Sequence, residues 1–300
     1  MPNYEFGKVP WGEFLEQIET ITISSGITTI GNNAFGNCLL LTNLNLPDGL
    51  RRIGEGSFLA CISLSSIILP PSLKEIGDGA FESCEKLETV SLPAQGLETI
   101  EPFAFTDCGA LANLEIPKTV TTIGRWAFSG CISIPKIVIP SSVRSIGDNA
   151  FSSNTALQEL TLSEGLETIE EAAFSACESL PEVLIPASVR EIGGGVFSDC
   201  FKLKKIDINP QNKAYTTIDG VLYTSDKQTI MQYPAGKEGS SFAIPTSVNK
   251  VGSLAFAGSV ALTSVTLHDG IKVIEDYGFA RCDELKAIAI PAGVVEIGNA

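Results

Sequence analysis

The sequence predicts a repeat solenoid, a rod built from stacked coils of similar length. Three observations in its 300 residues lead to this prediction. Of the eight cysteines, seven recur in steps of 23, 24 or 46 residues, at positions 38, 61, 84, 108, 131, 177 and 200, and the eighth is Cys282. A phenylalanine stands three residues before each cysteine, and a longer apolar motif keeps the same frame. A step of this size is typical of solenoids, and it excludes compact α/β and sandwich folds, whose core positions do not recur.

One regular copy of the motif runs from Leu64 to Lys86. It follows the pattern L-x-x-I-x-I-P-x-x-V-x-x-I-G-x-x-A-F-x-x-C-x-x. We count eleven copies between Ile18 and Lys286, one of them modified, and a twelfth that ends at Ala300. The predicted solenoid therefore has about 12 coils, with the last one truncated.

The elements of this copy follow in order. Residues 67–69 alternate in the period of a strand, and Pro70 ends that strand because proline cannot donate to a ladder. A second short extended segment covers residues 73–76. Gly77 permits the sharp bend that follows it. Residues 80–84 have the spacing of a short helical turn or 3-10 segment, which returns the chain to the start of the next coil.

A single 23-residue coil cannot bury both its apolar side chains and its backbone edges, whereas a stack of coils buries both. We expect parallel pairing of equivalent strands, with a strand ladder on one face and short strands or turns on the other. The side chains expected to point inward in the regular copy are Leu64, Ile67, Leu69, Leu73, Ile76, Ala80 and Phe81.

Each cysteine would lie at the same inward corner, as a buried thiol that acts as a small apolar group. Asn154 and Ser259 stand in its place in two copies, which favours a space-filling role. Disulfides between neighbouring coils are an alternative, since the rise between coils fits the required Cα separation. No C-x-x-C pair is present, so we expect neither a metal site nor a cofactor.

The motif resembles that of the BspA-like leucine-rich repeat family, and residues 116–131 and 185–200 match it nearly position by position. The resemblance implies a right-handed leucine-rich-repeat superhelix or horseshoe. It also implies a bacterial cell-surface or secreted protein that binds other proteins, including host extracellular-matrix proteins. Residues 1–17 resemble the lead-in to the first repeat, so we expect an N-terminal cap there and one solenoid over 18–300. Both ends are similar to those of a segment cut from a longer protein.

The period is interrupted between residues 209 and 241. From Phe197 to Phe256 there are 59 residues, which is two periods plus 13. Residues 218–223 and 229–234 predict two strands of a hairpin, joined by a turn at 225–228. Tyr223 and Tyr233 are candidate ligand contacts, because exposed tyrosine is favoured in recognition surfaces. The alternative is that both tyrosines pack the hairpin onto the stack.

Charge and composition narrow the function. A net charge of −15 disfavours nucleic acid as a partner. No apolar run reaches the roughly 18 residues of a membrane span, so no membrane insertion is expected. Histidine occurs once, as His268, with no nucleophile or orienting acid in a recognisable arrangement. These observations predict a non-enzymatic protein without catalytic residues.

The outward positions of the first strand form two columns along one face, and repeat proteins commonly bind partners on such surfaces. The candidate ligand-binding residues on this strand face are Asn113, Glu115, Lys136, Glu159, Thr161, Glu182, Lys205 and Asp207. We expect a monomer that binds a protein ligand, such as a host extracellular-matrix or surface protein. Two alternatives are a structural spacer that presents another domain, and a carbohydrate-binding module, although this face lacks the aromatic residues that sugar stacking favours.

Overall fold

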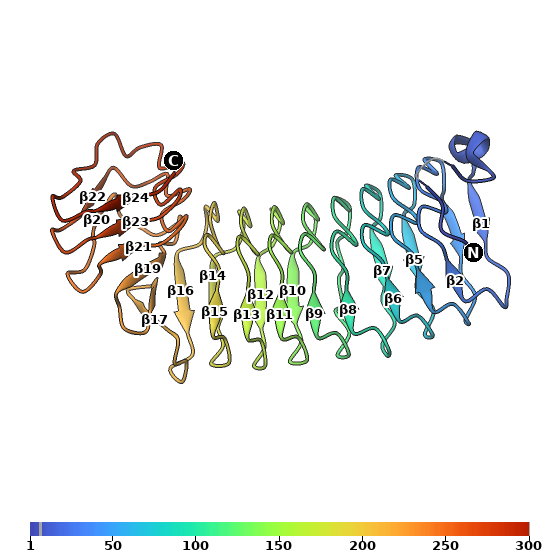
Figure 1. Cartoon of the computed structure of the whole chain (residues 1–300), viewed down its shortest axis with the longest axis horizontal. Coiled ribbons are helices and arrows are strands. Elements are labelled where there is room, and N and C mark those ends of the chain that lie inside the picture. The colour runs from blue at the N-terminus through green and yellow to red at the C-terminus, as the bar shows by residue number, and fades with distance from the viewer. Residues whose placement is uncertain (6–7, 300) are drawn as a thin grey trace.

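The computed structural model describes residues 1–5 and 8–299. It confirms the predicted solenoid of about 12 turns. Figure 1 shows the coils stacked along the long axis, with the N-terminal coils at one end and the C-terminal coils at the other. Each regular coil contributes two short strands and one corner of successive turns, which includes the Phe–x–x–Cys part of the motif.

The first strand of each coil is the longer one, and its outward residues define the surface that we call the first-strand face. Equivalent strands pair in parallel with a step of one coil, as in the register of Lys136 with Glu159 and of Glu182 with Lys205. The first strands are β1 (Thr20–Thr22), β3 (Asn43–Asn45), β5 (Ser66–Ile68), β7 (Thr89–Ser91), β10 (Lys136–Ile139), β12 (Glu159–Leu162), β14 (Glu182–Ile185), β16 (Lys205–Ile208), β20 (Ser241–Ala243) and β22 (Ser264–Thr266).

The second strand of each coil has two residues and forms longer parallel ladders. The second strands are β2 (Thr29–Ile30), β4 (Arg52–Ile53), β6 (Glu75–Ile76), β8 (Thr99–Ile100), β9 (Thr122–Ile123), β11 (Ser145–Ile146), β13 (Thr168–Ile169), β15 (Glu191–Ile192), β21 (Lys250–Val251), β23 (Val273–Ile274) and β24 (Glu296–Ile297). Their sheets run β2-β4-β6 and β8-β9-β11-β13-β15. The glycine after the strand permits this close stacking, since a Cβ on Gly77 would lie 2.6 Å from the backbone nitrogen of Glu55.

The first strands, in contrast, pair two by two: β1-β3, β5-β7, β10-β12, β14-β16 and β20-β22. Two prolines explain two of the breaks. Before β12 and β16, the N–H groups of Gln158 and Lys204 donate to the carbonyls of Pro135 and Pro181 in the preceding coil, at 2.8 and 2.9 Å. Pro135 is the equivalent of Gln158 one coil earlier, and Pro181 is the equivalent of Lys204. Neither proline has an N–H to donate to the coil before it. The ladder is therefore lost on the N-terminal side of β10 and of β14.

The core is a column of equivalent side chains. The seven inward residues expected in the regular copy are all at most 3% exposed, which confirms their placement. The corner phenylalanines stack from coil to coil, from Phe35 to Phe197, with ring centroids 5.3 to 5.8 Å apart. Stacked rings of this kind add to the free energy of burial and fix the register between coils.

All eight cysteines are free thiols, and all except the half-buried Cys282 are buried. The thiol of Cys61 donates to the carbonyl of Phe35 in the preceding coil at 3.4 Å, and the same contact recurs in other coils. Asn154 makes the equivalent bond through Nδ2 to the carbonyl of Phe128 at 3.0 Å. Burial raises the pKa of the Cys84 thiol to about 12, so this thiol stays neutral. The corner position thus fills space and donates a hydrogen bond.

The lead-in covers the N-terminal end of the core. It contains the 3-10 helix η1 (Gly12–Gln17), directly after Trp11. The indole of Trp11 stacks on Phe35 at 5.1 Å and donates to the carbonyl of Ala34 at 2.9 Å. It therefore occupies the place that a preceding coil's phenylalanine would take.

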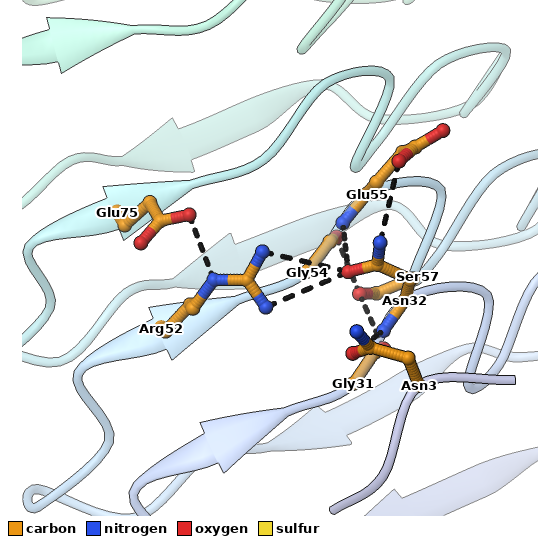
Figure 2. A network of polar contacts seen from close by, with 8 residues as sticks. All are labelled: Asn3, Gly31, Asn32, Arg52, Gly54, Glu55, Ser57 and Glu75. Atoms are coloured by element: carbon orange, nitrogen blue, oxygen red, sulfur yellow. Dashed lines mark hydrogen bonds and ion pairs between the residues drawn. The ribbon is translucent and has the colours of Figure 1, made fainter.

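A polar network joins the lead-in to the first three coils (Figure 2). The Asn3 side chain accepts from the backbone N–H of Asn32 at 3.0 Å, and the Asn32 side chain accepts from the N–H of Glu55 at 3.1 Å. Arg52 pairs with Glu75 at 2.7 Å. Each contact except the first links residues of neighbouring coils. Polar side chains at this corner therefore add to the backbone hydrogen bonds that hold successive coils together.

The interruption near residue 210 contains three strands: β17 (Tyr215–Ile218), β18 (Val221–Thr224) and β19 (Thr229–Gln232). β18 and β19 are antiparallel, with the turn at 225–228 where the sequence places it. The prediction of one strand over 218–223 is wrong. Asp219 and Gly220 have φ of 52° and 76° and form a tight turn between β17 and β18. Asp-Gly is a typical hairpin turn signal, which the apolar run around it obscured.

The stack changes direction at this interruption, which we call the junction. β19 pairs with β21 and starts the second-strand ladder of the C-terminal coils. On the corner side the added layer is incomplete, because Asp199 donates its N–H directly to the carbonyl of Ala257 at 3.4 Å. A layer that is complete on one side only acts as a wedge. Figure 1 shows the result: β21 to β24 are inclined to the strands of the main rod.

Candidate functional site

The structure places seven of the eight predicted contact residues at exposed positions of the first-strand face, and Asp207 at a half-buried one. Lys136 is on β10, Glu159 and Thr161 on β12, Glu182 on β14, and Lys205 and Asp207 on β16. Asn113 and Glu115 lie in the corresponding segment of a coil that forms no first strand. The eight residues thus span five consecutive coils.

Most charged candidate residues of this face form ion pairs. The Nζ of Lys136 lies 2.7 Å from the carboxylate of Glu159, and that of Lys205 lies 3.1 Å from Glu182 and 2.7 Å from Asp207. The hydrogen bonds that Lys205 donates to the carboxylates of Asp207 and Glu182 raise its pKa. Because these pairs are exposed, each contributes little to stability. The carboxylates outnumber the lysines among these candidates, so the face keeps a small excess of negative charge.

Large apolar side chains stand singly between these polar residues. Ile68 is 79% exposed, Leu184 57% and Val138 45%. Each occupies an outward position of its strand, where burial against the core is geometrically excluded. They offer apolar contact area along the face.

Residues 112–118 are the place where this face departs most from the repeat. A single bridge joins Asn113 to Thr89. Within residues 1–5 and 8–299, no backbone hydrogen bond joins Leu114, Glu115 or Ile116 to a neighbouring coil. The preceding coil is one residue longer than the usual 23, and Pro135 removes the donor on the other side. Backbone donors and acceptors of residues 114–116 therefore have no partner in the neighbouring coils of the described structure.

Two grooves flank this segment. The first has a volume of about 530 Å³ and lies between Thr89–Leu92 and Asn113–Lys118. The second, of about 400 Å³, lies between the same segment and β10. Their walls include the aliphatic side chains of Leu92 and Val138. We call the two grooves and the segment between them the split-ladder site.

The split-ladder site brings together three of the predicted residues. Asn113 and Glu115 line both grooves, and Lys136 lines the second. Glu159, Thr161, Glu182, Lys205 and Asp207 lie on the same face but outside these grooves. Sequence reasoning missed Lys118 and the grooves themselves. The signals for them are the longer repeat step and Pro135.

The prediction that the hairpin tyrosines contact a ligand is wrong. Tyr223 and Tyr233 are only 1% and 2% exposed, so the alternative, packing onto the stack, is what the structure shows. The ring of Tyr233 stacks on Phe256 at 5.4 Å, and its N–H donates to Ala255 as that of Phe58 does to Ala80. Tyr233 therefore takes the corner phenylalanine position of a shortened coil. Burial raises the pKa of both phenols.

His268 is held by the backbone. Its Nδ1 accepts from the N–H of Gly270 at 3.1 Å, and its Nε2 lies 3.0 Å from the carbonyl of Pro245. With Nδ1 accepting, Nε2 carries the proton and donates. In the described part of the chain, no cluster of three or more histidine, cysteine or acidic side chains is arranged to hold a metal ion. None of its helices has the length and apolarity needed to cross a bilayer.

The family model described as BspA type leucine rich repeat region matches residues 13–112, 98–219 and 235–300. The chain belongs to the BspA-type leucine-rich repeat family. This confirms the resemblance seen in the motif. Among curated proteins, none matches this chain.

Solved structures of leucine-rich repeat proteins are similar to this BspA-type chain. A leucine-rich cell-surface protein from Faecalibacterium prausnitzii A2-165 is 25% identical, with a TM-score of 0.68, over 94% of this chain and 87% of the other. A leucine-rich repeat protein from Bacteroides ovatus is 26% identical, with a TM-score of 0.64, over 94% and 75%. The pneumococcal vaccine antigen PcpA shares the fold at 24% identity and a TM-score of 0.58, over 99% and 70%.

Proposed function

We propose that this BspA-type repeat protein is a non-enzymatic binding protein that holds a protein ligand on its first-strand face, centred on the split-ladder site. The observation that carries the proposal is the unpaired backbone of residues 114–116 between two grooves. Unpaired backbone beside a groove offers hydrogen bonds to an extended segment of a partner.

The side chains around the site suit a protein surface. Leu92 and Val138 supply aliphatic contact, while Asn113, Glu115 and Lys118 supply hydrogen-bonding groups at the rim. This combination of an apolar centre and a polar rim is typical of protein interfaces. The ion-paired residues on β10 to β16 extend the contact area along the rod and set its register with the ligand.

We further propose that the ligand is a host extracellular-matrix or surface protein and that the chain acts at the cell surface or outside the cell as a monomer. The similar structure from Faecalibacterium prausnitzii is described as a cell-surface protein, which supports the proposed location. Two observations support the proposed adhesive role: the exposed first-strand face, and the membership of the chain in the BspA-type family.

Surface plasmon resonance against immobilised collagen, laminin and fibronectin tests this proposal. The double variant Glu115→Ala/Val138→Ser should bind its ligand on the order of tenfold more weakly, since it removes one polar and one apolar contact at the centre of the site. The matched control is Thr20→Ala/Thr22→Ala at the N-terminal end of the same face, which should retain the wild-type affinity.

Equal binding by the double variant and the wild type would show that the split-ladder site is not the contact. The spacer alternative predicts that none of the three matrix proteins binds the chain at all. Replacing Lys136, Glu159, Glu182 and Lys205 together with alanine then measures how far the contact extends beyond the grooves.

A further inference from the structure

Two aromatic side chains lie next to each other on a different side of the rod, after the second strands β8 and β9. Phe103 and Trp126 hold equivalent positions in consecutive coils. Their rings are parallel within 8°, with centroids 6.4 Å apart, and Trp126 is 37% exposed. In most other coils this position is small, with Asn33, Gly56, Gly79, Asn149, Ala172 and Gly195.

The backbone at this position disfavours large side chains. Phe103 and Trp126 have φ of 56° and 58°, in the left-handed region that glycine and asparagine tolerate best. Leu254, another large residue at this position, has a packing role, because a Cβ on Gly195 would lie 2.6 Å from its Cδ1 across the junction. Phe103 is half-buried and Trp126 is exposed, so both rings accept a strained backbone at a position that is only partly shielded from solvent.

One face of the Phe103 ring is already covered by a cation. The guanidinium of Arg125 lies over the ring, with Cζ 5.2 Å from the centroid. Arg125 and Trp126 both belong to the coil after Phe103. In the preceding coil the equivalent residue, Gly79, has no side chain, so no ring of that coil stacks on Phe103. We call the side of Phe103 that is directed toward Gly79 its open face.

Carboxylates lie beside Gly79 and near Arg125. Glu82 reaches over Gly79, since a Cβ there would lie 2.9 Å from Glu82 Oε2. Burial raises the pKa of Glu82, and repulsion from Asp107 and Asp78 raises it further. The pKa of Asp78 is raised by burial and lowered by Arg125. The carboxylates thus repel one another around a single guanidinium, and the electrostatic potential at the open face favours a further cation.

We propose that Phe103, Trp126, Asp78 and Glu82 form a docking surface for a basic segment of a protein partner. An arginine of that segment stacks on the open face of Phe103 and pairs with Glu82, as Arg125 already stacks on this ring. A planar guanidinium makes a stacking contact and a charge-assisted hydrogen bond at the same time. We call these four residues the aromatic corner. The inference goes beyond the proposed function, because this surface is separate from the first-strand face.

Isothermal titration of the whole chain with a blocked hexa-arginine peptide at low ionic strength tests the proposal. The variants Phe103→Gly and Trp126→Asn introduce residues that other coils have at this position. They leave the net charge unchanged and relieve the strained backbone, so the melting temperature should stay the same or rise. The affinity for the peptide should fall on the order of tenfold. Wild-type affinity in both variants would overturn the proposal.

A charge-matched comparison separates the aromatic corner from general attraction to an acidic chain. Asp78→Asn/Glu82→Gln should weaken binding clearly, whereas Asp48→Asn/Glu284→Gln, which removes two charges elsewhere, should not. Equal weakening by both pairs would overturn the proposal. So would quenching of Trp126 fluorescence by neutral cellohexaose without any hexa-arginine binding, which would assign the corner to a glycan. Val138→Ser, a change in the split-ladder site, should leave the affinity for the peptide unchanged. The outcome of this experiment therefore does not depend on whether the split-ladder site binds a ligand.

Discussion

The corner position that cysteine occupies in most coils donates a hydrogen bond to the phenylalanine carbonyl of the coil before it. This explains why asparagine is accepted there. Asn154 donates to the carbonyls of Phe128 and Phe151 at 3.0 and 2.8 Å, although its own Oδ1 has no donor in the described structure. Ser259 is buried at the same position, and its hydroxyl has no partner in the described structure. The position therefore requires a small side chain and favours a donor, and the thiol supplies both without leaving an acceptor unsatisfied.

Asn154→Ala should destabilise the protein by about 1 to 3 kcal/mol, because two buried carbonyls lose their donor. Asn154→Cys restores the motif, keeps one donor and removes the orphaned Oδ1, so its stability should equal or exceed that of the wild type. Urea unfolding in the presence of reductant measures both. Equal destabilisation by the two variants would show that side-chain volume alone matters at this corner.

At the scale of elements, the second-strand ladder ends at β15 because the hairpin follows. In the described structure a side chain closes that edge: the N–H of Ile192 donates to the hydroxyl of Tyr215 at 2.8 Å. In a regular stack this N–H would meet a carbonyl of the next coil. Tyr215 is buried, and burial raises the pKa of its phenol. The hydroxyl therefore replaces a backbone acceptor where the repeat cannot supply one.

Tyr215→Phe should destabilise the protein by about 1 to 2 kcal/mol, since it leaves a buried N–H without an acceptor while preserving the ring. The exposed tyrosine variant Tyr277→Phe is the matched control and should change little. Thermal or urea unfolding gives the comparison, with hydrogen exchange at Ile192 as a local readout. An unchanged exchange rate at Ile192 would contradict the assignment of this bond.

At the scale of the whole molecule, the junction joins the main rod to the C-terminal coils. Arg281 pairs with Asp199 at 2.6 Å across 82 residues of sequence, and the Asp199 side chain is only 12% exposed. Burial raises the pKa of Asp199, and Arg281 opposes this rise. The pair thus offsets the free-energy penalty of a buried carboxylate at the place where the hydrophobic core divides into two clusters.

Arg281→Ala should lower the free energy of unfolding by about 1 kcal/mol at neutral pH, a modest value because the arginine is largely exposed. Without its partner the charged form of Asp199 is disfavoured further in the folded state. As the pH falls through the raised pKa, Asp199 becomes protonated, so the difference from the wild type should shrink. Urea unfolding at pH 7 and pH 4 tests the sign, and Asp199→Asn/Arg281→Ala should show no such pH dependence.

The sequence by itself determined the coil. Its period, inward side chains, strand positions and corner cysteines are local properties of a 23-residue unit, and each copy repeats the same physical constraints on burial and turns. Most of the first-strand candidate residues are exposed as predicted because strand alternation fixes which side chains point outward. Whether they bind a partner is a property of the surface that periodicity does not specify.

The tertiary structure decided how neighbouring coils meet. Prolines and a one-residue insertion break the first-strand ladder, which creates the grooves beside residues 112–118. The hairpin buries Tyr223 and Tyr233 and turns the stack, because the layer that it adds is complete on one side of the rod only. The pairing of Lys136 with Glu159 and the stacking of Phe103 with Trp126 also depend on contacts between coils. A repeat motif specifies one coil well, but its surface chemistry arises where successive copies differ.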